Sequence, residues 1–252
     1  MWYGYLMQWF EDESFWRDLY PFMFHAGRWA DAEGEVDAVL RLSGASTPAH
    51  ARVLDLCCGP ARHSVPLARR GFEVTAVDRS AFLLDQARER AAGLAIEFAQ
   101  ADARDFVRDS AFDLAINLFT SFGYFETREE DEQVLRNLRR CLRPEGVLVL
   151  DVLGREPFTR LPAHTRWTES EGGSVVVQHA TPLENGARVE NRWLLVRGEH
   201  AQHFRFVLNL YSGGELRAML ERVGFGDVRL FGGLTGVAYD DAATRLVAVA
   251  RA

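Results

Sequence analysis

The segment from Val53 to His63, VLDLCCGPARH, is the part of the sequence from which the fold can be worked out. Its apolar first half predicts a strand that closes on the carboxylate of Asp55, and the small residues after it predict a tight turn that leads into a helix. Small residues let a ligand approach the backbone, and a helix N-terminus presents free N–H groups. A carboxylate in front of the turn would repel a pyrophosphate, whereas it suits a ligand that carries an ammonium group.

Strand and helix patterns alternate on the C-terminal side of this segment. Ser80 can cap the second helix, and Thr127 with Glu130 forms a capping box for the third. Such alternation predicts a parallel sheet with helices on both faces. The expected strands are 52–56, 73–77, 95–99, 112–118 and 147–152, and the expected helices lie near 61–70, 80–92 and 128–142.

Residues 164–211 change to a strand period, with an Asn185-Gly186 pair between two strand patterns. Asn-Gly in that position is a strong hairpin signal. We therefore expect an antiparallel β insertion after the fifth strand, built from segments 174–178, 188–196 and 203–210. Residues 212–252 return to the α/β pattern, with a capping box at Ser212 and Glu215 and two last strands at 228–231 and 245–250.

Two further acids follow the next two predicted strands. Asp78 closes the second strand, and Asp102 follows the third. A carboxylate at the end of the second strand can accept both hydroxyls of a ribose, and an acid after the third can accept the amino group of an adenine. Ligands of open α/β sheets bind at the carboxyl ends of the strands. Three acids in this order therefore indicate a site for a nucleoside with a cationic group.

These residues resemble the motifs of a known family. The segment Asp55–Arg62 resembles motif I of the class I (Rossmann-like) S-adenosylmethionine-dependent methyltransferases, and Asp78 and Asp102 match the acids of motifs II and III. The strings INLFTSFGYF (116–125) and LYS (210–212) are similar to a bacterial subgroup that acts on small molecules. The resemblance implies an α/β, doubly wound, seven-stranded sheet of order 3-2-1-4-5-7-6, in which the last strand is antiparallel.

The resemblance also implies a division of the chain and a set of cofactor contacts. Residues 1–50 would form an aromatic helical cap, 51–163 the S-adenosylmethionine-binding half of the core, 164–211 a substrate lid and 212–252 the end of the core. Cys57 and Ala61 stand where the family motif has its first and third glycines, so we expect the turn to avoid glycine-only dihedral angles there. The expected cofactor-binding residues are Asp55, Cys57, Gly59, Ala61, Arg62, Asp78, Arg79, Asp102, Ala103, Asn117 and Leu118.

The implied reaction is N- or O-methylation of a small soluble molecule by in-line transfer. The sulfonium is already a good leaving group, so the protein mainly aligns the acceptor and excludes water. A hydroxyl acceptor would need a base, for which Tyr124, Glu126, His25 and His203 are candidates, with Tyr124 and then His25 preferred as catalytic residues. The expected substrate-binding residues are Tyr20, Phe119, Tyr124 and Arg205.

Composition narrows the alternatives. All 29 basic residues are arginine, which excludes a P-loop lysine and a Schiff-base lysine. The net charge of −7 and the absence of an Asp/Asn-Pro-Pro-aromatic string after the fourth strand disfavour a nucleic-acid substrate. No apolar run approaches the roughly 20 residues of a membrane helix, and no cluster with metal-ligand spacing is present.

Three cysteines, two of them adjacent, are no disulfide framework and favour the cytoplasm. Two other functions stay open as hypotheses. One is a methyltransferase-like module that binds the cofactor, or regulates, without turnover. The other is a nicotinamide oxidoreductase, which the carboxylate before the turn disfavours. The oligomeric state cannot be deduced from the sequence.

Overall fold

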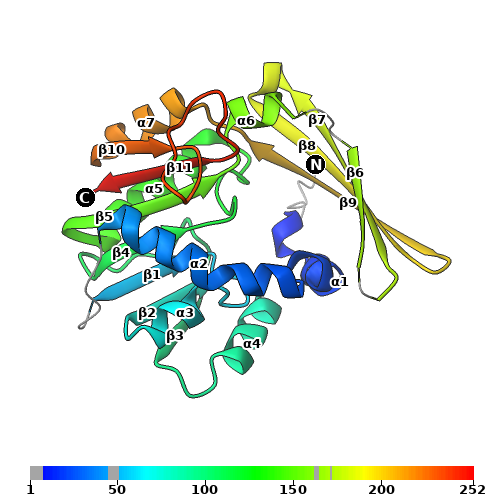
Figure 1. Cartoon of the computed structure of the whole chain (residues 1–252), viewed down its shortest axis with the longest axis horizontal. Coiled ribbons are helices and arrows are strands. Elements are labelled where there is room, and N and C mark those ends of the chain that lie inside the picture. The colour runs from blue at the N-terminus through cyan, green and yellow to red at the C-terminus, as the bar shows by residue number, and fades with distance from the viewer. Residues whose placement is uncertain (1–7, 45–50, 162–164, 171) are drawn as a thin grey trace, which may run out of the picture.

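A central sheet of seven strands forms the core of the fold, and a smaller antiparallel sheet lies beside it (Figure 1). The computed structural model describes residues 8–44, 51–161, 165–170 and 172–252. The strand order, β10-β11-β5-β4-β1-β2-β3, confirms the predicted order, and β11 runs antiparallel to both of its neighbours. The strands are β1 (Arg52–Leu56), β2 (Glu73–Asp78), β3 (Ile96–Gln100), β4 (Phe112–Asn117), β5 (Leu142–Val152), β10 (Gly226–Phe231) and β11 (Leu246–Arg251).

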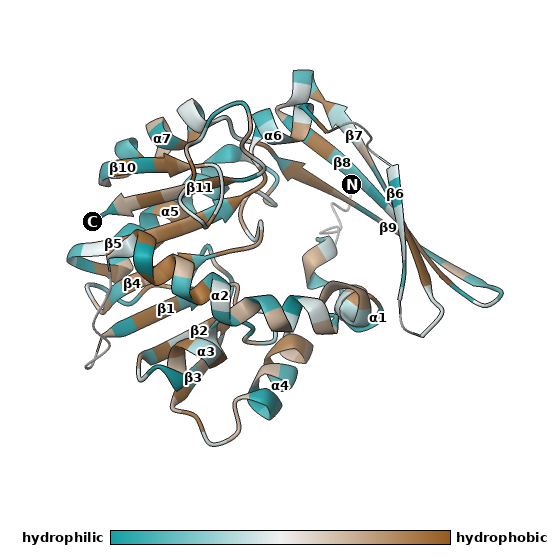
Figure 2. Ribbon diagram, viewed as in Figure 1, coloured by the Kyte–Doolittle hydropathy of each residue, from teal (hydrophilic) through white to brown (hydrophobic). Residues whose placement is uncertain are grey.

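Each central strand supplies side chains to two hydrophobic cores, one on each face of the sheet. Val53 packs into one core and its neighbour Leu54 into the other, because successive side chains of a strand point to opposite faces. Figure 2 shows apolar stretches, in brown, along these strands. Helices α2 (Ala26–Ser43), α3 (Ser64–Arg69) and α4 (Ala81–Arg90) cover one face, and α5 (Arg128–Cys141) and α7 (Gly213–Arg222) cover the other.

The insertion after β5 is a separate antiparallel sheet, as expected. It consists of β6 (Thr165–Glu169), β7 (Val175–Leu183), β8 (Arg188–Arg197) and β9 (His200–Asn209), in that order. Asn185 and Gly186 make the hairpin between β7 and β8 with φ angles of 54° and 83°. The short helix α6 (Arg155–Thr159) precedes the sheet. The strand β6 is absent from the predicted elements, because it is an edge strand whose side chains are all exposed and which therefore has no alternating apolar pattern.

The N-terminal segment joins the two sheets. After the short helix η1 (Trp9–Glu11), helix α1 (Glu13–Met23) places Phe15 and Leu19 against the inner face of the second sheet, where Phe206 and Leu195 are buried with them. The aromatic residues at positions 2, 3 and 5 lie outside the described residues. Within the described ranges, no helix is both long and apolar enough to cross a membrane.

Candidate functional site

The first acid of the predicted site lies inside the protein. Asp55 is 2% exposed near the end of β1, and its Oδ2 accepts a hydrogen bond of 2.5 Å from the hydroxyl of Ser64 at the start of α3. Burial raises the pKa of Asp55, although His63 and Ser64 act in the opposite direction. A buried carboxylate whose charge is incompletely balanced favours a cationic ligand.

The turn after β1 adopts a left-handed backbone at three positions. The φ angles of Cys57, Gly59 and Ala61 are 61°, 56° and 64°. The expectation that Cys57 and Ala61 avoid glycine-like dihedral angles is therefore wrong. A left-handed conformation costs a non-glycine residue roughly 1–2 kcal/mol, and this turn carries that strain at two residues. Strain of this kind is concentrated at ligand-binding sites.

Asp78, the second acid, ties the turn to the end of β2. Its Oδ2 accepts from the backbone N–H of Gly59 at 2.8 Å, and its Oδ1 accepts from the backbone N–H of Ser80 at 2.9 Å. Burial raises the pKa of Asp78 to about 6, in spite of these two hydrogen bonds. The carboxylate is thus held in one orientation by backbone donors, with remaining lone pairs to offer a ligand.

Asp102, the third acid, is enclosed by arginines. Its Oδ1 accepts from the backbone N–H and Nε of Arg104, and its Oδ2 accepts from Nη2 of Arg104 and Nη1 of Arg79. Burial raises the pKa of Asp102, but the hydrogen bonds and charge of Arg104 outweigh it, so the pKa lies below its ordinary value. A carboxylate has about four lone-pair sites, and in this structure all four are used.

The N-terminal segment is anchored beside these acids. Glu11 pairs with Arg79, and Glu13 accepts from the hydroxyl of Ser80 and from two backbone N–H groups at the start of α4. A carboxylate at a helix N-terminus is stabilising because the free N–H groups are there. The segment forms one side of a pocket of about 420 Å³, which is lined by Phe10, Glu11, Glu13, Arg79, Gln100, Ala101 and Asp102.

Three further predicted cofactor residues lie around the same edge. Asn117, 1% exposed at the end of β4, donates from Nδ2 to the carbonyl of Leu56 at 3.0 Å. Its Oδ1 is buried, and no donor in the described residues reaches it. An orphaned buried acceptor costs free energy unless a ligand supplies a donor. Leu118 and Ala103 are buried nearby in the two cores.

The loop after β4 is held in an unusual conformation by two residues, Asp151 and Arg245, that are not among the predicted site residues. Phe119 and Thr120 have φ angles of 62° and 61°. Asp151 of β5 accepts from the N–H of Phe119 at 3.1 Å, and Arg245 bonds both Asp151 (2.8 Å) and the hydroxyl of Thr120 (2.9 Å). The available signal was a carboxylate, Asp151, at the end of an apolar strand.

Tyr124 lies further along this loop among aromatic rings. Its ring centroid is 5.0 Å from that of Trp9 and 6.1 Å from that of Phe206. Burial raises the pKa of Tyr124 to about 12, although Arg245 lowers it. The phenol therefore stays protonated at neutral pH, which suits a hydrogen-bond donor better than a general base.

Phe119, a predicted substrate residue, is surrounded by cations. The guanidinium carbons of Arg62, Arg28 and Arg245 lie 4.0, 4.6 and 5.8 Å from the centroid of its ring. Arg62 is 4% exposed and pairs with Glu35 of α2. The predicted cofactor residue Arg62 and the predicted substrate residue Phe119 are thus in direct contact.

Two predicted substrate residues are not brought to this site. Arg205 lies on the outer face of the second sheet, where it pairs with Glu190 and its side chain is 71% exposed. Successive side chains of a strand point to opposite faces, and Phe206, the next residue of β9, packs inward. The prediction that Arg205 binds the substrate is therefore wrong. Tyr20 faces α4, with its ring against Phe82 and its hydroxyl 3.4 Å from Arg90 Nε.

The alternative bases are exposed. His25 is the N-cap residue of α2 and makes no capping hydrogen bond from its side chain. Glu126 lies on the surface before α5, and His203 lies on the outer face of β9. None of the three has the buried setting that tunes a catalytic base.

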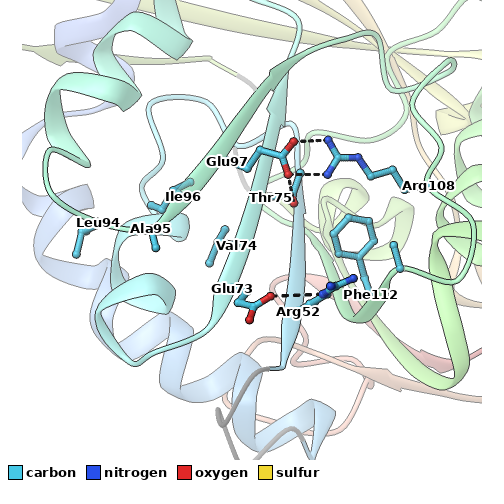
Figure 3. A pocket seen from close by; sticks show the side chains of 11 residues that line it. Arg52, Glu73, Val74, Thr75, Leu94, Ala95, Ile96, Glu97, Arg108 and Phe112 are labelled. Atoms are coloured by element: carbon cyan, nitrogen blue, oxygen red, sulfur yellow. Dashed lines mark hydrogen bonds and ion pairs between the residues drawn. The ribbon is translucent and has the colours of Figure 1, made fainter.

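A larger pocket, of about 550 Å³, lies at the other end of the strands and plays no part in this site (Figure 3). Its charged side chains are paired with one another: Glu97 with Arg108, and Arg52 with Glu73 at 3.4 Å. Ligands of such sheets bind at the carboxyl ends of the strands, and this pocket opens at the amino ends.

Comparison with known proteins agrees with the geometry. Residues 53–146 match the family model of the methyltransferase domain. The putative methyltransferase YqeM of Bacillus subtilis is 36% identical over 110 residues, which cover 43% of this chain and 44% of that protein. A second relative is a dTDP-3-amino-3,4,6-trideoxy-alpha-D-glucopyranose N,N-dimethyltransferase of Streptomyces venezuelae. It is 26% identical over 224 residues, which cover 87% of this chain and 93% of that protein.

Among solved structures, the chain is similar to CalS10 with bound S-adenosylmethionine, an amino pentose methyltransferase from Micromonospora echinaspora. The identity is 26% and the TM-score 0.68, over 94% of this chain and 95% of that one. The strand order, the three acids at successive strand ends and the matched domain lead to one conclusion. Residues 53–146 carry a methyltransferase domain, and the chain as a whole is similar to class I S-adenosylmethionine-dependent methyltransferases in sequence and fold, as its motifs predict.

Proposed function

We propose that the protein transfers the methyl group of S-adenosylmethionine to an amine nitrogen of a small soluble molecule. The observation that carries the choice of nitrogen is the state of the loop after β4. Tyr124 has a pKa of about 12, and the carboxylate of Asp151 is occupied by Arg245. An amine attacks as its neutral form without a protein base, whereas a hydroxyl needs one.

The residues at the carboxyl edge fit the cofactor. The bound cofactor would supply an electrophilic methyl group on a sulfonium. We assign the buried carboxylate of Asp55 to its ammonium group, Asp78 to its ribose hydroxyls and the turn from Cys57 to Ala61 to close backbone contact. The orphaned Oδ1 of Asn117 supports the fit, because it needs a donor from a ligand.

Asp102 has a different role in this proposal. Its four acceptor sites are filled by Arg79 and Arg104, so an adenine amino group can bond to it only by displacing a guanidinium. Arg79 is the one that can leave, because it makes a single hydrogen bond to Asp102 and can keep its ion pair with Glu11, whereas Arg104 makes three hydrogen bonds to Asp102. We infer that Arg79 shifts when the adenine enters.

The acceptor would lie between the loop after β4 and the inner face of the second sheet, which makes that sheet the lid. The relative from Streptomyces venezuelae is named for N,N-dimethylation of an amino sugar linked to a nucleotide, and the structure from Micromonospora echinaspora for an amino pentose. Glycine/sarcosine N-methyltransferases are also among the relatives. These names support an amine acceptor and direct the choice of compounds for the test.

The test has two stages. Isothermal titration with S-adenosylhomocysteine establishes binding, with Asp85→Asn on the exposed face of α4 as control. Release of S-adenosylhomocysteine is then measured with amino sugars, nucleotide-linked amino sugars and amino acids, each beside its hydroxyl analogue. We expect turnover with an amine and none with the matched hydroxyl compound. Binding without turnover on any amine would favour the module without turnover, and turnover only on hydroxyl compounds would overturn the assignment to nitrogen.

A further inference from the structure

The last strand of the second sheet is hydrogen-bonded to the loop after β4 through Asn209. This residue ends β9 and is 5% exposed. Its backbone N–H donates to the carbonyl of Gly123 at 2.7 Å, and its Nδ2 donates to the carbonyl of Phe125 at 3.0 Å. These two carbonyls stand on either side of Tyr124, so Asn209 holds the backbone both before and after that residue.

The close approach of loop and strand requires a glycine. Gly123 has a φ angle of 101°, which glycine adopts without strain. A Cβ at this position would lie 2.7 Å from the backbone oxygen of Asn209, which is too close for two atoms in contact. The loop and the strand therefore meet backbone to backbone.

The side-chain amide of Asn209 is itself held in one orientation. Its Nδ2 also donates to Oδ2 of Asp131 at 2.8 Å, and the hydroxyl of Tyr211 donates to the same oxygen at 2.6 Å. Asp131 is fully buried in the first turn of α5. The amide nitrogen has two hydrogens, and a flipped amide would turn its oxygen toward two acceptors. Such a flip would leave a buried carboxylate short of a donor, which costs free energy.

The loop depends on such contacts for its path. Residues 118–127 form neither helix nor strand, and backbone groups outside regular structure need partners elsewhere. The ring of Tyr124 packs against Trp9 and Phe206, but apolar packing has no direction. Hydrogen bonds to the flanking carbonyls do have one, so we expect Asn209 to fix where the Tyr124 side chain starts.

We propose that Asn209 is a positioning residue for methyl transfer, which sets Tyr124 opposite the acceptor and ties it to the second sheet. This inference rests on the proposed function, in which the acceptor lies between that sheet and the loop. Asn209 acts through Tyr124 and not by touching the substrate. A displacement of about 1 Å in the alignment of an acceptor is enough to lower the rate of transfer.

The position of Tyr124 can be measured without an acceptor. The protein is labelled with 3-fluorotyrosine, and its fluorine spectrum is recorded with and without S-adenosylhomocysteine. The resonance that is missing from Tyr124→Phe belongs to Tyr124. We expect Asn209→Ala to move this resonance toward that of free fluorotyrosine, because the ring leaves its packed position.

The matched control is Asn137→Ala. Asn137 is also a buried asparagine, 2% exposed, and it donates to the backbone carbonyls of Ala103 and Arg104. Urea denaturation shows how far each variant lowers the free energy of unfolding. We expect Asn137→Ala to leave the Tyr124 resonance in place even where its loss of stability is similar.

A second variant perturbs the same contact from the loop side, and it decides the matter if Asn209→Ala does not fold. Gly123→Ala places a methyl group against the backbone oxygen of Asn209. Its control is Gly71→Ala, where φ is 89° and no described atom lies within 4 Å of the added Cβ. Both variants carry the strain of a positive φ, but only Gly123→Ala should move the Tyr124 resonance.

Turnover is then measured at saturating S-adenosylmethionine with the amine that the screen of amino sugars, nucleotide-linked amino sugars and amino acids identifies. Asn209→Ala should lower kcat by about three- to tenfold and keep the dissociation constant of S-adenosylhomocysteine within about twofold of the wild type. Adding Tyr124→Phe should lower kcat no further, because a residue that acts through another is not additive with it.

The positioning role is refuted if Asn209→Ala and Gly123→Ala leave the Tyr124 resonance where their controls leave it. It is also refuted if the losses in kcat from Asn209→Ala and Tyr124→Phe multiply in the double variant. A wild type that neither binds S-adenosylhomocysteine nor turns over any amine refutes the proposed function, and with it the role in transfer. The fluorine spectra then still show whether Asn209 holds Tyr124, so the two failures are distinguishable.

Discussion

Replacing Asp78 by asparagine should separate the stability of the fold from its affinity for the cofactor. Burial raises the pKa of Asp78 from an ordinary 3.8 to about 6. At about 1.4 kcal/mol for each pH unit, keeping this carboxylate ionised at pH 8 costs the folded state about 3 kcal/mol. Asparagine removes that cost.

The same substitution loses a hydrogen bond. Both oxygens of Asp78 accept from backbone N–H groups, of Gly59 and Ser80, and an amide can present its one oxygen to only one of them. The shifted pKa already includes these hydrogen bonds to the ionised carboxylate. The additional loss is the backbone N–H that the Nδ2 of asparagine would leave buried without an acceptor, which costs about 1–3 kcal/mol. The two effects have opposite signs and similar size, so we expect the free energy of unfolding at pH 8 to change by less than about 1.5 kcal/mol.

Cofactor binding has no such compensation. If the carboxylate accepts the ribose hydroxyls, its loss costs about 1.5–3 kcal/mol of binding free energy, which is roughly 10- to 100-fold in the dissociation constant. Urea denaturation measures the first quantity and titration with S-adenosylhomocysteine the second. Affinity within threefold of wild type would refute the ribose assignment, and a loss of stability above about 3 kcal/mol would refute the reasoning on burial.

The pH dependence of stability carries a sign that can be checked. Between pH 4 and 6 the folded protein holds a proton on Asp78 that the unfolded chain has released. The free energy of unfolding that this proton adds is fully present below about pH 4 and is lost as the pH rises through about 6. The Asp78→Asn variant should therefore show a shallower fall in unfolding free energy over this window than the wild type.

Three further substitutions test other parts of the structure. Asp131→Asn should stabilise the protein by about 1–3 kcal/mol at pH 8 in urea denaturation. Burial raises the pKa of Asp131 to about 6, and a single oxygen accepts from both Tyr211 and Asn209, so the one oxygen of an amide can keep both hydrogen bonds. A variant less stable than the wild type would contradict this reasoning. Arg245→Gln should lower kcat by roughly 10- to 100-fold through the loss of loop alignment, with S-adenosylhomocysteine affinity unchanged, and an equal loss of affinity would place Arg245 in the cofactor site instead. Tyr124→Phe should lower kcat by less than about tenfold and leave the alkaline side of the pH profile in place; a shifted profile would identify Tyr124 as the base.

Much of the fold was predictable from local pattern. The resemblance to a known family implied the seven-stranded order. Alternating strand and helix periods predicted the individual elements and a parallel sheet, and the Asn185-Gly186 pair placed the hairpin of the inserted sheet. These features depend on residues close together in the chain, where period and turn chemistry act directly. The edge strand β6 escaped because all its side chains are exposed, so burial imposes no alternation on it.

The sequence by itself determined the resemblance to methyltransferases, the cofactor that it implies and the strand ends at which the three acids stand, because these follow from short motifs and from the geometry of parallel sheets. Only the tertiary structure decided how those acids are occupied. Arg79, 23 residues earlier in the sequence, occupies one oxygen of Asp102, and Arg245 holds a loop more than 100 residues earlier in the sequence. Partners so distant leave no periodic signal, because their distance in space depends on how the sheets, the cap and the last strand pack together.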